Sequence, residues 1–158
     1  MKASTESSKA TPEAFLAMGR EALASQPFSV LLGAELHAPS PGRIELHLPV
    51  APKLLQQHGF VHGGVISYLA DNALTFAGGT AMQVPVVTAE FKINYTRPAT
   101  GERLIARAQA VHVGTSQSVC TCEVFTVTDG VEKLCAIAQG TIARLPSPPP
   151  SHASQDVP

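Results

Sequence analysis

The triplet His62-Gly63-Gly64 and the carboxylate of Asp71 are the residues of this chain best suited to chemistry. Two glycines at a helix start leave backbone N–H groups uncovered by any Cβ, so a substrate oxygen can approach them and the positive end of the helix dipole. Asp71 follows within an otherwise apolar helical run, about 10 to 12 Å further along at 1.5 Å per residue. Aspartate is a poor helix former, and two turns into a helix the favourable effect of the dipole has largely faded, so we interpret Asp71 as a functional residue.

The composition predicts a single globular domain and excludes several classes of partner. Of the 158 residues 44% are hydrophobic and 15% charged, as in a folded globular chain. A net charge of −1 and 5% aromatic residues provide neither a basic field nor a stacking platform, so no nucleic-acid partner is expected. No apolar stretch reaches the roughly 18 residues of a membrane helix, and the start of the chain lacks the apolar centre of a signal peptide. We therefore predict a cytoplasmic protein with no membrane partner.

Cysteine and histidine spacing predicts neither a metal site nor a cofactor. Cys120, Cys122 and Cys135 are odd in number and lie in apolar runs without the paired spacing of zinc ligands, which indicates reduced structural thiols. His58 and His62 stand four residues apart, but glycine-rich surroundings disfavour a rigid ligand pair and no third ligand follows. We expect His62 to be a structural residue of the site, hydrogen-bonded so that it holds the loop and the Gly63 donor.

Both ends of the chain are predicted to be disordered tails flanking one domain. Residues 1–10 are small and polar, and residues 146–158 are rich in prolines that remove donors and fix φ, which leaves residues 11–145 for the domain. Thr11 followed by Pro12 predicts a helix that continues to about Ser25. Two short strands, at residues 30–37 and 43–50, are expected to form a hairpin.

One main helix and a series of strands should follow. Apolar and small residues at spacings of three and four predict a helix over residues 63–79, with Gly78-Gly79 as its C-terminal stop. Strict alternation predicts a strand over residues 86–95 with one core face and one polar face. Three further strands, at residues 104–113, 118–127 and 133–143, are expected to form an antiparallel meander. The fold class is therefore α+β, with one sheet and one main buried helix.

The residues that carry a resemblance to a known family are Gln56, Gly59, His62-Gly63-Gly64, Asp71-Asn72, Asn94-Tyr95, Arg97-Pro98-Ala99 and Gly101. Together they resemble the hotdog-fold acyl-CoA thioesterases of the PaaI (phenylacetate pathway) type, over roughly residues 54–143. The resemblance implies an antiparallel sheet wrapped around one long central helix, with a peripheral N-terminal helix. It also implies a homodimer with two active sites at its interface, often paired again as a dimer of dimers, that is, a homotetramer.

The resemblance assigns the main catalytic roles to Asp71 and Gly63 of opposite subunits. Asp71 would be the catalytic carboxylate, as general base or as nucleophile, and both roles remain open. The Gly63 N–H would polarise the thioester carbonyl, which gains negative charge when it is attacked. Gln56 would orient the attacking water or the thioester, and Thr88 would position the nucleophile, although a surface glutamine and a solvated strand threonine are equally ordinary.

The resemblance also implies a channel for an acyl-CoA substrate. The positions concerned are Gly64, Tyr95, Thr96, Arg97 and Pro98, and the turn Gly114, Thr115 and Ser116. Backbone groups would bind the pantetheine arm and a few cations the phosphates. Aryl-acetyl, short-chain and medium-chain acyl groups all remain open.

Two other functions are compatible with the same fold. A hotdog hydratase or dehydratase also uses a histidine and an acid, but with a different histidine loop and spacing. A non-catalytic acyl-CoA-binding module is possible because fold does not determine function, yet such a module has no need of Asp71. We therefore expect a thioester hydrolase.

Overall fold

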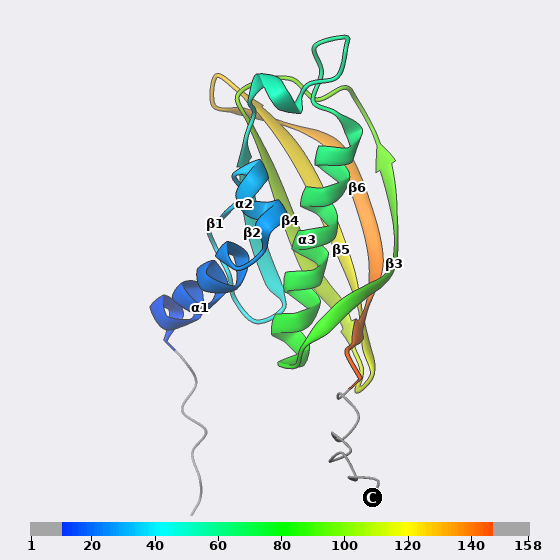
Figure 1. The fold of residues 1–158 in the computed structure, drawn as a ribbon. Coiled ribbons are helices and arrows are strands. Elements are labelled where there is room, and N and C mark those ends of the chain that lie inside the picture. The colour runs from blue at the N-terminus through cyan, green and yellow to red at the C-terminus, as the bar shows by residue number, and fades with distance from the viewer. Residues whose placement is uncertain (1–10, 147–158) are drawn as a thin grey trace, which may run out of the picture.

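The computed structural model describes residues 11–146, and its centre is one long helix lying along a curved antiparallel sheet (Figure 1). The six strands are arranged in the order β1-β2-β4-β5-β6-β3, and every neighbouring pair is antiparallel. The strands are β1 (Glu35–Leu36), β2 (Arg43–Pro49), β3 (Val86–Tyr95), β4 (Arg103–Val113), β5 (Gln117–Thr128) and β6 (Val131–Arg144). The helices are α1 (Pro12–Ala24), α2 (Pro27–Leu32), the 3-10 turn η1 (Pro52–Leu54) and α3 (Gly63–Met82). The predicted α+β layout and the β4–β5–β6 meander are confirmed. The predicted tails lie outside the described residues, apart from Pro146.

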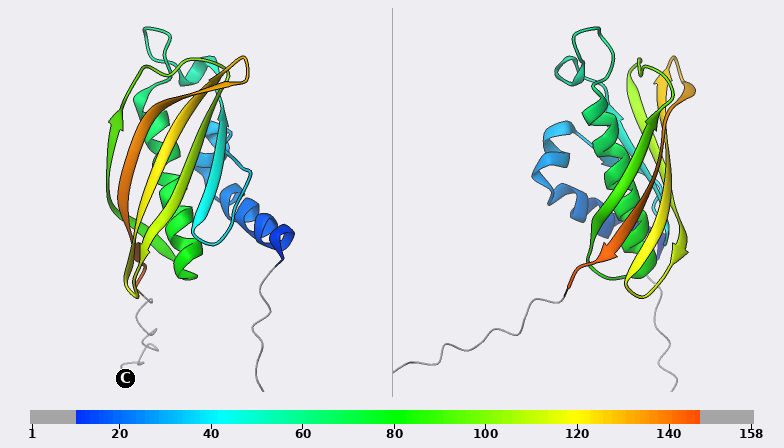
Figure 2. Two further views of the ribbon diagram at one scale, coloured as in Figure 1. Left: turned by 180° about the vertical axis from the view of Figure 1, so that it is seen from behind. Right: turned by 90° about the vertical axis from the view of Figure 1, so that its right-hand side faces the viewer.

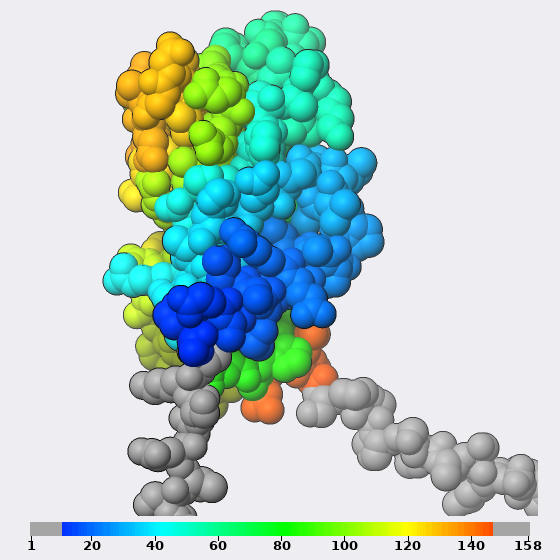
Figure 3. Space-filling view, turned by 90° about the vertical axis from the view of Figure 1, so that its left-hand side faces the viewer, coloured from blue at the N-terminus to red at the C-terminus, as the bar shows by residue number. Residues whose placement is uncertain are grey.

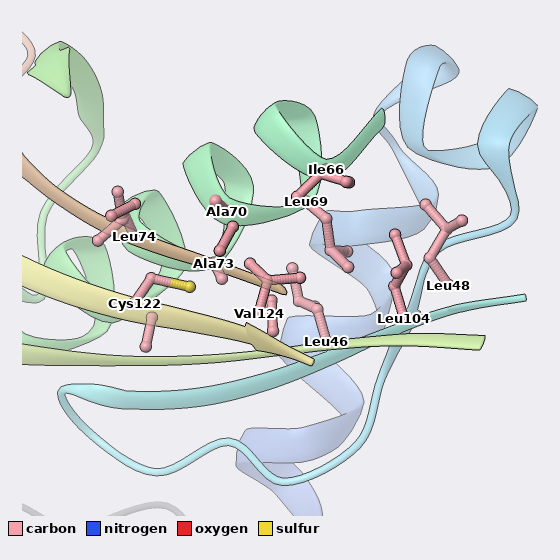
Figure 4. Packing of buried hydrophobic residues seen from close by; sticks show 14 of the residues in the cluster. Leu46, Leu48, Ile66, Leu69, Ala70, Ala73, Leu74, Leu104, Cys122 and Val124 are labelled. Carbon is pink, nitrogen blue, oxygen red and sulfur yellow. The ribbon is translucent and has the colours of Figure 1, made fainter. Parts of the chain in front are cut away.

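The core lies between α3 and the concave face of the sheet, which curves around the helix (Figure 2). The helix contributes small side chains such as Ala70 and Ala73, both fully buried, and these let the sheet approach closely. The sheet contributes larger aliphatic residues such as Leu46, Leu104 and Val124 (Figure 4). In the described part of the chain, no helix combines the length and apolarity that crossing a membrane requires.

The predicted stop at Gly78-Gly79 is wrong, because α3 continues through both glycines to Met82. A Cβ on Gly78 would lie 2.7 Å from Ile142 Cβ and from Ser118 Oγ, and one on Gly79 would lie 3.0 Å from Val86 Cγ2. These glycines therefore serve the close approach of the sheet. The helix ends instead at Gln83, whose left-handed backbone (φ 55°) caps it.

The predicted strand over residues 30–37 is also wrong. Pro27 at the first turn and Gly33 at the C-cap (φ 78°) enclose a six-residue helix, α2, and only the two residues of β1 join the sheet. The apolar run of α2 is too short to show a helical period, so it resembles a strand in the sequence. The predicted hairpin survives in reduced form, because β1 pairs with β2. Helix α1 begins as predicted, with Thr11 Oγ1 accepting from Ala14 N at 3.3 Å, and α1 and α2 form a raised layer on the outside of the molecule (Figure 3).

Strand β3 departs from the strict alternation that was predicted for it. The pairing with β6 shifts between Thr88 and Glu90, a β-bulge that inserts one extra residue. Val86 and Thr88 are therefore half-buried before the bulge, and Phe91 and Ile93 after it, while Val87 is exposed. The polar face predicted for Thr88 is wrong, because the bulge turns this residue toward α3.

Candidate active site

A tight loop before α3 determines where the helix begins. Leu55 and Val61 form an isolated antiparallel bridge, and Gln56 N donates to Phe60 O at 2.8 Å. The loop turns at Gly59, whose φ of 80° favours glycine. Val61 N then donates to Ala99 O at 2.9 Å, which ties the loop to the segment after β3. The start of α3 and the residues following β3 are thereby held side by side.

The first turn of α3 has one engaged glycine amide and one that is available. His62 is the N-cap, and its Nδ1 accepts from the Gly64 N–H at 2.9 Å. Val65 N donates to His62 O at 2.9 Å, whereas Gly63 N–H has no acceptor among the hydrogen bonds of residues 11–146. His62 thus caps the helix through Gly64, and its predicted role in holding the Gly63 donor stays a prediction. Gly63 is left as the donor that a ligand oxygen can reach, and Gly64, predicted to bind substrate, is engaged by the cap.

An open groove of about 460 Å³ lies at this helix start, and we call it the Gly63 groove. It brings together six of the predicted site residues from two segments of the chain. Tyr95 donates from its hydroxyl to Gly63 O at 3.0 Å, with Ser67 Oγ 3.2 Å away, and is 51% exposed. Thr96 N donates to Cys135 O at 2.9 Å. The lining residues are Gln56, Phe60, Val61, Gly63, Ile66, Tyr95, Thr96, Arg97, Pro98 and Ala99.

Asp71 lies further along α3, half-buried on the side that faces β3. Its Oδ1 accepts from the Thr88 hydroxyl at 2.7 Å, so Thr88 is placed beside the carboxylate, as predicted for a positioning hydroxyl. Asp71 follows Gly63 by eight residues on one straight helix, a separation of about 12 Å along its axis. One chain therefore does not bring these two groups together.

The turn Gly114–Ser116 lies at the opposite end of the molecule from the Gly63 groove. It follows β4, whose first residue Arg103 pairs with Val127 near the groove end, and Ser116 O accepts from Arg144 N at the far end of β6 (Figure 1). Within one chain, Gly114, Thr115 and Ser116 are separate from the other predicted substrate-binding residues.

Comparison with known proteins identifies the family. The thioesterase superfamily model matches residues 58–133, which contain both Gly63 and Asp71. A 1,4-dihydroxy-2-naphthoyl-CoA hydrolase from Listeria monocytogenes is 30% identical over 114 residues, covering 71% of this chain and 90% of that protein. The chain belongs to the thioesterase superfamily.

Solved structures of relatives agree with this identification. A thioesterase family protein from Silicibacter pomeroyi is 38% identical with a TM-score of 0.76, covering 78% of this chain and 93% of that one. A mutant of the phenylacetic acid degradation protein PaaI from Thermus thermophilus is 33% identical with a TM-score of 0.68, covering 76% of this chain and all of that one. The hotdog fold, the PaaI-type resemblance and the identity as a thioester hydrolase are confirmed.

The cysteines of this thioesterase are structural. All three are buried and free, and burial raises the pKa of Cys122 to about 12 and that of Cys135 to about 11. A thiol with a raised pKa is a poor nucleophile because the thiolate is the reactive form. No group of three or more His, Cys, Asp or Glu side chains within residues 11–146 is placed to bind a metal ion.

Sequence reasoning did not assign roles to two residues next to Asp71. Asn72 is 8% exposed, and its Nδ2 lies 3.1 Å from Gln26 Oε1, 3.3 Å from Ser29 Oγ and 3.1 Å from Tyr68 OH, which fastens α2 to α3. Thr75, one turn after Asp71, contacts both Asp71 and Thr88. The spacing of four residues between Asp71 and Thr75 was the available signal for the second, whereas nothing in the sequence indicated the partners of Asn72.

Proposed function

We propose that this thioesterase hydrolyses an acyl-CoA to the free acid and CoA, at a site built from two copies of the chain. The observation that carries the proposal is the difference between the two glycine amides at the helix start. His62 accepts from the Gly64 N–H, whereas the Gly63 N–H stays available in the Gly63 groove. A preorganised amide at a helix N-terminus stabilises the oxyanion that forms when a thioester carbonyl is attacked. Asp71 supplies the carboxylate that activates water or attacks the carbonyl carbon.

The need for a second copy follows from distance. A carbonyl whose oxygen accepts from Gly63 lies about 3 Å from that amide, and the Asp71 carboxylate of the same chain is about 12 Å further along the helix. A partner chain whose α3 runs antiparallel to this one would bring its Asp71 to the Gly63 groove. Strand β3 ends the sheet beside Asp71 and offers unpaired backbone groups for such an association. A homodimer therefore completes two equivalent sites.

The remaining groove residues suit the other parts of the substrate. Gln56 has its Oε1 engaged by His58 N at 2.7 Å, so its NH₂ is the group that can orient water or the thioester. Exposed Arg97 supplies a cation for the CoA phosphates. The Gly114–Ser116 turn would serve the channel only through the partner chain. An aromatic acyl group is one candidate, because the Listeria relative is named as a hydrolase of a naphthoyl-CoA.

Thiol release from a panel of aryl-acetyl-, short- and medium-chain acyl-CoAs tests the activity. We expect free CoA with the wild type, and a kcat lower by about 10² to 10⁴ in Asp71→Asn, which keeps the shape of the side chain but removes the base. Binding without thiol release would favour the acyl-CoA-binding module. A change in enoyl absorbance without thiol release would favour the hydratase.

Subunit complementation tests the shared site. Asp71→Asn and Gly63→Pro should each be inactive as pure proteins. Mixed after unfolding and refolding, they form heterodimers in which one site has two intact groups and the other has none, so about a quarter of the wild-type activity should return. A mixture that stays inactive would show that both groups act from one chain.

A further inference from the structure

Three contacts link four oxygen atoms around Asp71 in a way that the roles assigned so far do not explain. Thr88 Oγ1 lies 2.7 Å from Asp71 Oδ1, Thr75 Oγ1 lies 2.8 Å from Thr88 Oγ1, and Thr75 Oγ1 lies 2.9 Å from the backbone carbonyl of Asp71. Both threonines are half-buried, where such contacts are harder for water to replace. The contacts form a closed circuit from the side chain of Asp71 back to its own main chain.

Counting hydrogens determines how this circuit is arranged when Asp71 is ionised. Each hydroxyl has one hydrogen, and an ionised carboxylate only accepts. Thr88 must therefore donate to Asp71 Oδ1, which leaves its own oxygen as an acceptor. A hydrogen on Thr75 that served the Asp71 carbonyl alone would leave two lone pairs facing each other at 2.8 Å. The arrangement without repulsion has the single Thr75 hydrogen shared between the Asp71 carbonyl and Thr88 Oγ1 as a bifurcated bond, so that one hydroxyl holds the other.

We propose that Thr75 is a positioning residue of the thioesterase reaction, which orients the Thr88 hydroxyl toward the carboxylate of Asp71. This inference rests on the proposed function, because it assumes that Asp71 reacts as base or nucleophile. With Oδ1 held by Thr88, the second carboxylate oxygen is the one that meets water or the thioester. Hydrogen bonds that are linked in series polarise one another, so removal of the Thr75 hydroxyl weakens the hydrogen bond between Thr88 and Asp71.

A purely structural role for Thr75 predicts a different experimental result. Threonine in a helix often bonds back to the carbonyl four residues earlier, and Thr80 does so in the same helix, at 2.7 Å from Phe76 O. Thr80 also accepts from Gly42 N at 3.1 Å, far along α3 from Asp71. Thr80 is therefore a matched control, because it shares the back-bond, the helix and a cross-element contact.

The test compares Thr75→Val, Thr75→Ser, Thr88→Val and Thr80→Val on the best acyl-CoA of the panel. Valine keeps the shape of threonine and removes the hydroxyl. We expect Thr75→Val to lower kcat about tenfold, as for the loss of one hydrogen bond to a charged network, with KM unchanged. Thr75→Ser should restore most of kcat, and Thr80→Val should leave kcat unchanged while lowering the melting temperature. In the double variant Thr75→Val/Thr88→Val, the decrease in kcat should be smaller than the product of the two single decreases, because both substitutions break the same series of hydrogen bonds.

The outcomes separate the two proposals. A wild type that releases no CoA would overturn the proposed function and this inference with it. An active wild type whose kcat is unchanged in Thr75→Val, or a double variant whose losses multiply, would overturn this inference alone. Should Thr75→Val fail to fold, Thr75→Ser and Thr75→Ala take its place, and a kcat that follows the melting temperature rather than the presence of the hydroxyl contradicts the positioning role.

Discussion

The two glycine pairs of α3 show that one dipeptide can have opposite purposes in a single helix. Gly63-Gly64 opens the helix at a groove, where a Cβ on Gly63 would meet only Tyr95, at an ordinary contact distance of 3.4 Å. Gly78-Gly79 lies inside the helix, where a Cβ on Gly78 would overlap with Ile142 and Ser118. In the proposed function the first pair provides access for a ligand, whereas the second pair lets the protein's own sheet approach the helix. Substitutions at the two pairs should therefore affect different properties.

Within the two glycine pairs, the largest effect is expected for Gly63→Pro. Proline is favoured at the first position of a helix, and His62, at φ −61° and ψ 134°, already has the extended backbone that a following proline requires. The variant removes the proposed oxyanion donor without breaking a helix bond, so kcat should fall by about 10² to 10³. The measurement is steady-state kinetics alongside a melting curve.

Gly63→Ala is the control for that experiment, because alanine keeps the N–H. It should retain more activity than Gly63→Pro, with a loss set by its methyl group beside Tyr95. Equal kcat values for the wild type and Gly63→Pro would remove Gly63 from the mechanism.

Gly78→Ala should have the larger effect in the second pair, and on stability rather than chemistry. The added methyl group would have to displace Ile142 and Ser118, both fully buried, at a cost of about 1 to 3 kcal/mol. Urea denaturation measures this change, and kcat per folded molecule should be close to the wild-type value. Gly79→Ala is the milder comparison, because its Cβ would meet a single methyl group of Val86 at 3.0 Å. A Gly78→Ala protein as stable as the wild type would contradict the close-approach role.

Asp71→Ala should change stability little while it abolishes turnover. Alanine is a better helix former by about 0.6 kcal/mol, and the change also removes the acceptor of the Thr88 hydroxyl. These effects oppose each other, so the melting temperature should be maintained or slightly raised. A pronounced loss of stability with retained activity would make Asp71 a structural residue.

The smallest expected effect is a pH dependence of the stability, caused by His47 on the outer face of the sheet. Burial lowers the pKa of His47, outweighing its bond to Glu45 at 2.7 Å, while the stacked His37 and nearby Arg103 act in the same direction as burial. The unfolded chain thus binds a proton at His47 more readily, so stability should fall as the pH drops below about 6.5.

Urea midpoints at pH 7.5 and 5.5 measure this dependence, and His47→Gln, which keeps a donor for Glu45, should reduce it. The pKa of Glu45 is also lowered, because the bonds from Arg107 and His47 outweigh the opposing effect of burial. Its contribution is lost only at lower pH, as the carboxylate is protonated. An equal pH dependence in the wild type and His47→Gln would contradict the role of His47.

The sequence predicted correctly those features that depend on neighbouring residues, and it failed for features that depend on contacts between distant segments. The helix start at Gly63 depends on neighbouring residues, and it was predicted correctly. The role of Gly78 depends on Ser118 in β5 and Ile142 in β6, forty or more residues away, and the glycine pair was mistaken for a local stop. The α2 segment was misassigned because six residues hold less than two helical turns.

The candidate site divides in the same way. The groove residues Gln56 and Arg97 were grouped through a resemblance, and the structure brings them together. The contact of Thr75 with Thr88 arises only when α3 and β3 are packed, so no pattern within either segment indicates it.

The bulge in β3 has a consequence for how this strand can vary. One extra residue at Ala89 lets Thr88 face α3 while Phe91 and Ile93 still face the interior. Deleting that residue would put either the hydroxyl or the two apolar side chains on the wrong side. The insertion thus separates the strand into a half that presents the Thr88 hydroxyl to Asp71 and a half that packs against the core.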